Sequence, residues 1–217
     1  MKVRGMLIVS LVLALAMLGF GVWVAAGLEP GTRLPVHWNI EGEADRSAPA
    51  MVALILPAGM VVLLGMLFAA LPRLEPLQQR LEASAPVLRA VWIGSLMVMS
   101  YVQVMTAAPA LGWPIGPDLM LVGIGALLVM IGDALPKSRP SLLVGIRTPW
   151  TLRDADNWIA THRLGGKLMV IAGILIVLAA FMPLPPGFRM IAIAGFVSAA
   201  ALVPVMYSWW LARSQIT

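Results

Sequence analysis

Residues 137–167 read KSRPSLLVGIRTPWTLRDADNWIATHRLGGK, the stretch of this chain in which polar and charged side chains are concentrated. The stretch holds six of the fifteen basic residues, one of the two histidines and two of the eight tryptophans. Long apolar runs flank it on both sides. This pattern predicts a polar loop held between membrane helices, and the rest of the chain is arranged around it.

The overall composition excludes an ordinary soluble domain. Of the 217 residues, 60% are hydrophobic and only 12% are charged. Basic residues exceed acidic ones by five, and in so apolar a chain this excess is typical of loops at an anionic membrane surface, not of direct nucleic-acid binding. The absence of cysteine excludes disulfides, thiolate metal sites and a cysteine nucleophile.

Six apolar runs have close to the length of about 20 residues that a bilayer core requires. They predict transmembrane helices over residues 6–28, 51–71, 90–109, 119–135, 168–182 and 191–211. A cleaved signal peptide is the alternative for the first run, but signal h-regions are shorter, about 7–15 residues. We therefore expect an all-α integral membrane protein with six transmembrane helices and both termini in the cytoplasm.

The distribution of basic residues tests this topology independently. Twelve Lys and Arg residues fall on the predicted cytoplasmic side, and three (Arg33, Arg46 and Arg189) fall outside. Residues 29–50 then form an extracytoplasmic polar loop, which their Pro and Gly residues predict to be irregular. Residues 137–167 form a long cytoplasmic loop, and residues 72–89 form either a short surface helix or a plain connector. We divide the chain into an N-terminal two-helix region, 1–89, and a C-terminal four-helix region, 90–217.

The outer loop brings one histidine close to several acids. His37 precedes Glu41, Glu43 and Asp45, a set that could hold a divalent ion or bind a cationic peptide. One histidine without a thiolate is a weak signal for zinc, so we predict neither a metal site nor a cofactor. The alternative is a solvated acidic loop whose Trp38 lies among the lipid headgroups.

The inner loop carries signals for a turn followed by a helix. Gly145 permits a turn that a side chain would oppose. Thr151 and Asp154 have the spacing of a capping box, which predicts a helix from about Leu152 that continues into the fifth span. Such a helix would place Asp154 beside Trp158, and Trp158 beside His162, on one face.

Arg147 and Trp150 are the candidates for recognition within the inner loop. The guanidinium of Arg147 could bind a phosphate or a carboxylate, with the Trp150 ring beside it. The alternative is that the basic residues of this loop only set the topology and contact anionic lipids.

Two polar residues interrupt the predicted spans. Asp133 lies at the inner end of the fourth span, where a carboxylate is costly unless it reaches water or a base such as Lys137. Gln103 in the third span needs only an interhelical hydrogen bond, worth about 1 kcal/mol, to explain its presence. Together with the proline at position 57, these residues favour, as the alternative function, a small membrane transporter or exporter.

Enzyme motifs are missing from the sequence. It contains no HExxH, GxSxG or P-loop pattern and no serine in a nucleophile elbow. A membrane enzyme acting on a lipid-linked phosphate held by Arg147 and His162 would lack a convincing base and nucleophile. We therefore predict that the protein is not an enzyme.

The inner loop resembles the signature of the SdpI-type immunity protein family of bacterial membrane proteins. The matching residues are Gly145-Ile146-Arg147-Thr148-Pro149-Trp150-Thr151-Leu152, then Trp158 and Thr161-His162-Arg163, preceded by Gly132-Asp133-Ala134-Leu135-Pro136-Lys137. The outer Pro35-x-His37-Trp38-Asn39-x-x-Gly42-x-x-Asp45 is similar to the N-terminal domain of unknown function found in the same proteins. The family usually has Asn where Asp133 and Ser141 stand in this chain.

This resemblance implies a non-catalytic immunity and signal-transduction protein of the bacterial plasma membrane. Its expected partners are membrane lipids, a secreted peptide toxin and, in the best-known case, a small DNA-binding repressor held at the cytoplasmic face. The residues expected to meet the extracytoplasmic ligand are Pro35, His37, Trp38, Asn39, Gly42 and Asp45. The residues expected to meet the cytoplasmic partner are Gly145, Arg147, Thr148, Trp150, Thr151, Asp154, Trp158, His162 and Arg163.

Overall fold

A computed structural model describes residues 3–39, 41–74, 82, 84–116 and 118–214. Within these residues, six helices are long and apolar enough to cross a membrane. They are α1 (Val3–Ala26), α2 (Ala50–Leu74), α4 (Ala85–Leu111), α5 (Leu119–Ala134), α7 (Ala155–Phe181) and α8 (Pro186–Ser214). The chain is an all-α multi-pass membrane protein with one small β-hairpin.

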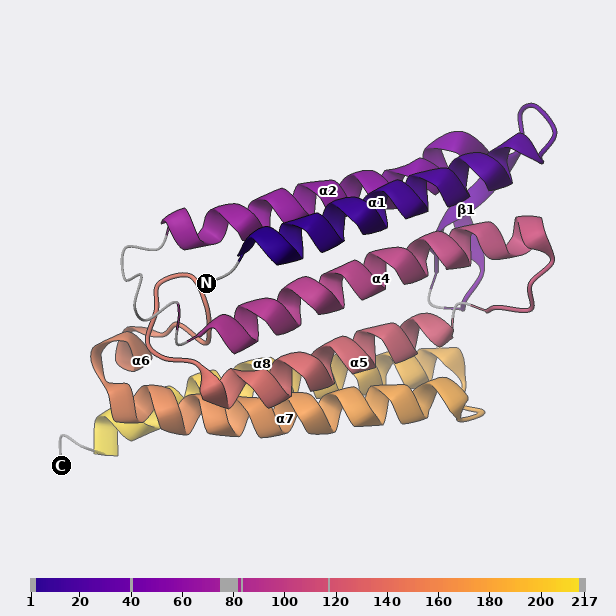
Figure 1. Ribbon diagram of the computed structural model, residues 1–217. Helices are drawn as coiled ribbons and strands as arrows, with labels where there is room; N and C mark the ends of the chain where they lie inside the picture. The colour runs from indigo at the N-terminus through magenta and orange to yellow at the C-terminus, as the bar shows by residue number, and fades with distance from the viewer. Residues whose placement is uncertain (1–2, 40, 75–81, 83, 117, 215–217) are drawn as a thin grey trace.

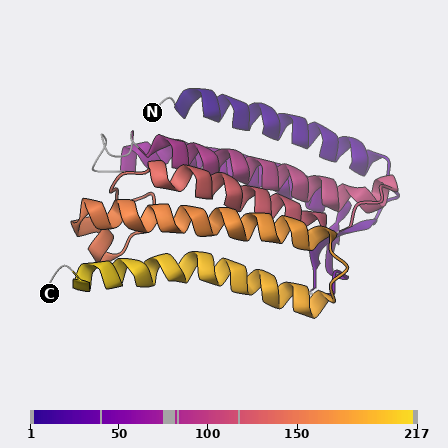
Figure 2. The same ribbon diagram turned by 90° about the horizontal axis from the view of Figure 1, so that it is seen from below.

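The long helices pack in the order of the chain, each against the next. Figure 2 shows α1 along one side of the bundle and α8 along the opposite side. The hairpin of β1 (Arg33–Trp38) and β2 (Ala44–Pro49) lies at one end, which we call the hairpin end. The short helix α6 (Pro149–Arg153) and the loop before it lie at the other, the motif end, where α1 begins and α8 ends (Figure 1).

Helices α5 and α7 are antiparallel and touch through glycines. A Cβ on Gly132 would lie 2.7 Å from the carbonyl oxygen of Gly166, and one on Gly166 would lie 2.6 Å from that of Gly132. Gly125 and Gly173 repeat this reciprocal contact two turns away, at 2.5 Å in both directions. Small residues let two backbones approach closely, which is the usual basis of helix association in membranes.

Helix α4 joins the first two helices through buried polar side chains. The Gln103 side-chain amide donates to the carbonyl oxygens of Met17 in α1 and Leu54 in α2, both at 2.7 Å. Trp92 donates from its indole nitrogen to the Ser10 hydroxyl at 2.9 Å. These bonds satisfy polar groups that would otherwise be costly within a membrane, and Gln103 acts as the interhelical contact that its place in an apolar helix predicted.

The outer segment contains an ordered hairpin, so the prediction of an irregular loop there is wrong. Pro35 and a register shift between Pro35 and His37 hide the alternation that would have indicated a strand. Leu34 is buried among Val24, Ala53 and neighbouring apolar side chains, which attaches β1 to the helices.

The fifth long helix begins earlier than its apolar run. The prediction of a helix from about residue 152 that continues into the span is close, because α7 begins at Ala155 and runs without interruption to Phe181. Its first turns carry polar residues, so hydropathy alone placed the span from 168 onward. The surface helix considered within residues 72–89 falls largely outside the described residues.

Candidate functional site

His162 fixes the inner loop onto α7. Its Nε2 accepts a hydrogen bond from the Ile146 backbone N–H at 2.8 Å, and its Nδ1 lies 2.8 Å from the Trp158 carbonyl oxygen, which can only accept. The imidazole is therefore neutral, with its proton on Nδ1. Because both nitrogens are engaged and the side chain is fully buried, His162 holds the loop in place and is not available as a base or a metal ligand.

Gly145 allows the loop to approach this imidazole. Its φ is +116°, and a Cβ there would lie 2.5 Å from His162 Nε2 and 2.7 Å from the Trp158 ring. The Trp158 and His162 rings stack with centroids 4.0 Å apart, which confirms the prediction that they share one helix face. Trp158 also donates to the Ser138 hydroxyl at 3.1 Å, so the beginning and the end of the inner loop meet at this ring.

The capping box of the loop lies three residues earlier than predicted. Thr148 precedes α6, and its hydroxyl accepts from the Thr151 N–H at 3.1 Å while the Thr151 hydroxyl accepts from the Thr148 N–H at 2.9 Å. The predicted box of Thr151 and Asp154 is therefore wrong. Pro149 favours a helix start directly after Thr148, and Asp154 instead caps α7 by accepting from the Asp156 N–H at 2.9 Å.

A buried polar network continues from the loop into the last helix. The hydroxyls of Thr148 and Ser208 are 3.0 Å apart, and the Asn157 amide donates to the Ser208 carbonyl oxygen at 2.8 Å. Thr161 donates to the Asn157 amide oxygen at 3.1 Å. Asn157 and Ser208 were not among the predicted site residues, and the final span contains a second serine, Ser198, so the sequence alone did not single out Ser208.

The predicted cytoplasmic residues divide into a buried and an exposed group. Thr148, Thr151, Trp158 and His162 are buried and maintain the loop conformation. The exposed group contains Arg147, whose guanidinium donates to the Leu142 carbonyl oxygen at 2.6 Å, and Arg163. Trp150 and Asp154 are half-buried. A partner approaching this end would therefore meet the two arginines and the exposed part of Trp150.

Asp133 does not line a path through the bundle. Its carboxylate is exposed on the outer surface of α5 and pairs with Lys137 at 2.8 Å. Gln103 lies on α4 and is occupied by its two interhelical bonds. These two polar residues therefore do not combine into a transport site, and of the observations that favoured a transporter only Pro57, inside α2, is left.

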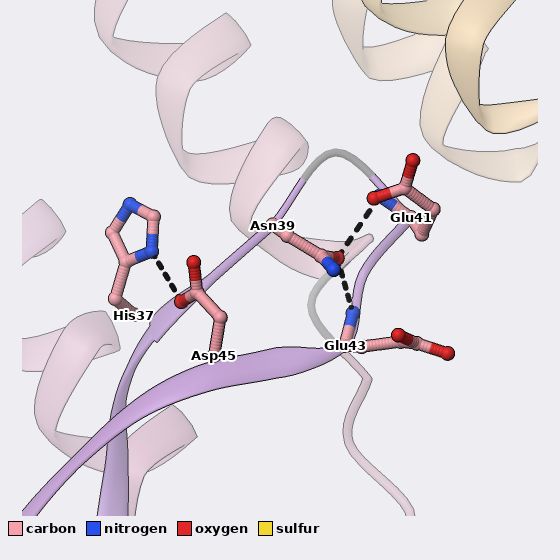
Figure 3. A network of polar contacts seen from close by, with 5 residues as sticks. All are labelled: His37, Asn39, Glu41, Glu43 and Asp45. Carbon is pink, nitrogen blue, oxygen red and sulfur yellow. Dashed lines mark hydrogen bonds and ion pairs between the residues drawn. The ribbon is translucent and has the colours of Figure 1, made fainter.

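The outer motif forms the hairpin itself (Figure 3). The Asn39 side-chain oxygen accepts from the N–H groups of Glu41 and Glu43 at 3.0 and 2.9 Å, and Gly42 supplies the positive φ of +84° that the turn requires. His37 and Asp45 face each other across the strands, with Nδ1 and Oδ1 2.6 Å apart. The turn and the pair explain why these residue types occur at this spacing.

The charges of the hairpin do not gather into a metal site. The hydrogen bond with His37 is the main cause that lowers the pKa of the exposed Asp45 carboxyl from its usual value. Figure 3 shows the Glu43 side chain directed away from the His37 and Asp45 pair. Among the described residues, no group of three His, Asp or Glu side chains is placed to bind a metal ion.

At the hairpin end an ion pair also joins α5 to α8. Arg189, largely covered, contacts the Asp118 carboxylate at 2.9 Å. The helix that carries Ser208 at the motif end is thus held at its opposite end as well.

Two family descriptions match segments of this chain. Residues 137–208 match the SdpI/YfhL protein family, and residues 11–61 match a domain of unknown function, DUF1648. The chain is therefore similar to SdpI-type proteins that carry an N-terminal DUF1648 domain. The network from Ser138 to Ser208 falls within the first match, and the hairpin, with His37 and Asp45, falls within the second.

This chain is also similar to Immunity protein SdpI from Bacillus subtilis (strain 168). It is 30% identical to this chain over 89 residues, which are 40% of this chain and 43% of the relative. The match thus spans less than half of either protein. No solved structure matches this chain.

Proposed function

We propose that this SdpI-type chain is a non-catalytic immunity protein of the bacterial plasma membrane that confers resistance to a secreted peptide toxin. The observation that carries the proposal is its similarity to Immunity protein SdpI, together with the match of residues 137–208 to the family. Both ring nitrogens of His162 are hydrogen-bonded to backbone groups, so neither is left to act on a substrate. This supports a role without catalysis.

In this proposal the motif end faces the cytoplasm. The support is the distribution of positive charge, since bacterial membrane proteins retain basic residues inside. Among the described residues, three basic side chains belong to the hairpin end: Arg33, Arg46 and Arg189. The other described basic side chains are Arg4, Arg73, Arg89, Lys137, Arg139, Arg147, Arg153, Arg163, Lys167 and Arg213.

The hairpin then receives the toxin on the outer side. Its exposed tip carries Glu41 and Glu43, and the pair of His37 and Asp45 is partly exposed. Such a surface suits a peptide with basic residues. The ligand-facing residues in this proposal are Pro35, His37, Trp38, Asn39, Gly42 and Asp45.

On the cytoplasmic side, the exposed face of the motif end holds a repressor after toxin has bound. Arg147 and Arg163 offer exposed guanidinium groups, and Trp150 adds a half-buried aromatic side chain at the same end, a combination that favours an acidic, partly apolar protein surface. The N-terminal region, 1–89, serves as the receiving part and the C-terminal region, 90–217, as the transmitting part.

The test is survival of toxin-sensitive bacteria that express the chain, challenged with a secreted peptide toxin of the type that SdpI-like immunity proteins counter. Expression of the unaltered chain should raise survival, and His37→Ala or Arg147→Ala should reduce it at equal membrane levels determined by blot. Arg153→Ala removes an exposed positive charge at the same end and serves as the matched control. Unchanged survival on expression of the unaltered chain would refute immunity against that toxin, and an equal loss with Arg153→Ala would assign the effect to net charge.

A further inference from the structure

A groove opens on the bundle surface at the motif end, between α5 and α7. Gly132 and Gly166, which bring the two helices into close contact, form part of its lining. Pro136 and Lys167 border the groove, and Val170 also lines it. Its volume of about 360 Å³ falls within the range of small-molecule sites, about 300–1,000 Å³.

The groove carries a positive charge that no carboxylate of the described residues neutralises. Asp133 lines it as well, but its carboxylate is paired with Lys137 at 2.8 Å, so these two charges cancel. Lys167 is exposed, and no described carboxylate lies within ion-pair distance of its ammonium. Arg163 stands one helical turn before Lys167 on the same face of α7, also exposed. An anion is therefore the complementary ligand.

The position of the groove along α7 indicates that the ligand also has an apolar part. Lys167 is the last charged residue before the apolar run that ends α7. Val170 and Ile171 continue the groove on the apolar side, and the Ile171 side chain is about half exposed. A ligand that follows the groove thus meets an ammonium first and an aliphatic surface next. A long lysine side chain at such a border extends its ammonium toward the headgroup level.

We propose that this groove is a binding site for one anionic phospholipid of the surrounding membrane. The lipid phosphate contacts the Lys167 ammonium, and an acyl chain lies along Val170 and Ile171. A basic pocket between membrane helices is a known arrangement for anionic headgroups. The site is independent of the proposed immunity function, because none of its three contacts lies in the hairpin or in the loop of residues 138–153.

The test compares purified protein in nanodiscs of phosphatidylcholine alone with nanodiscs that also contain phosphatidylglycerol. Retained lipids are counted by native mass spectrometry, and the affinity for phosphatidylglycerol is measured by titration. Lys167→Gln should weaken that affinity about fivefold, the factor expected for one lysine at an anionic lipid surface. Lys167→Arg should retain it, and Arg153→Gln, which removes an exposed charge on α6, should leave it unchanged.

Ile171→Trp keeps the charge and fills the apolar part of the groove, so it should also displace the retained lipid. This variant keeps the proposal testable if Lys167→Gln does not fold. An equal affinity for phosphatidylglycerol in the unaltered chain, Lys167→Gln and Ile171→Trp would overturn the proposal. An equal loss with Arg153→Gln would overturn it too, because the attraction would then belong to the whole basic surface.

Discussion

Replacing Gly145 by alanine should release the inner loop from α7. Two costs follow from the geometry. The backbone at φ +116° is unfavourable for a residue with a side chain, at about 1–3 kcal/mol. The new Cβ would also lie 2.5 Å from His162 Nε2, so the imidazole must move and leave the Ile146 N–H without its acceptor, which costs about 1–3 kcal/mol more. We expect the free energy of unfolding to fall by about 2–6 kcal/mol in total.

Alanine substitutions at two other glycines separate the backbone cost from the cost of the lost contact with His162. Gly112 also has a positive φ, +65°, but its Cβ position is open, so Gly112→Ala should carry only a backbone cost of about 1–2 kcal/mol. Gly59 has neither restriction, and alanine there should leave stability unchanged or raise it by up to about 1 kcal/mol. The assay is unfolding of the three variants in mixed micelles, followed by tryptophan fluorescence. If Gly145→Ala loses no more stability than Gly112→Ala, the contact with His162 does not hold the loop and the reasoning is refuted.

Three further predictions concern other contacts. Gly166→Ala should lower the free energy of unfolding by about 1–3 kcal/mol, because its Cβ would press on the α5 backbone; Gly59→Ala is the control in the same unfolding assay. Asn157→Ala should cost about 1–3 kcal/mol through the unsatisfied groups it leaves in the network, and an unchanged unfolding midpoint would show that water replaces the amide. The pKa of Asp45 lies below its usual 3.8, so the pair with His37 contributes stability above that pH and loses it as pH falls through the lowered pKa. An NMR titration should show the Asp45 pKa rising in His37→Ala, and no change would contradict the role of this bond.

The helices could be predicted because the membrane imposes a simple rule. Each run of about 20 apolar residues must satisfy its own backbone, and only a helix can do so. The stacking of Trp158 and His162 was equally predictable, since residues four apart on a helix share a face. In both cases the information is local in the sequence.

Other features depend on contacts between distant parts of the chain. Asn157 and Ser208 are 51 positions apart, and no local pattern indicates that one would bind the other. The hairpin was missed because its turn is formed by the Asn39 side chain and its first strand contains Pro35, so neither alternation nor a common turn dipeptide marks it. The capping box was predicted at the wrong threonine because both Thr148 and Thr151 can precede a helix. Pro149 favours a helix that starts directly after Thr148.

The hairpin joins α2 without any intervening residue, since β2 ends at Pro49 and α2 begins at Ala50. The Ala50 N–H donates to the Thr32 carbonyl oxygen at 2.9 Å, which fastens both sides of the hairpin base to the first turn of the helix. Because no residue separates the two elements, the hairpin cannot move independently of the start of α2. A force applied to its tip therefore acts on the first turns of α2, where the hydrogen bond from Gln103 to the Leu54 carbonyl oxygen resists their rotation.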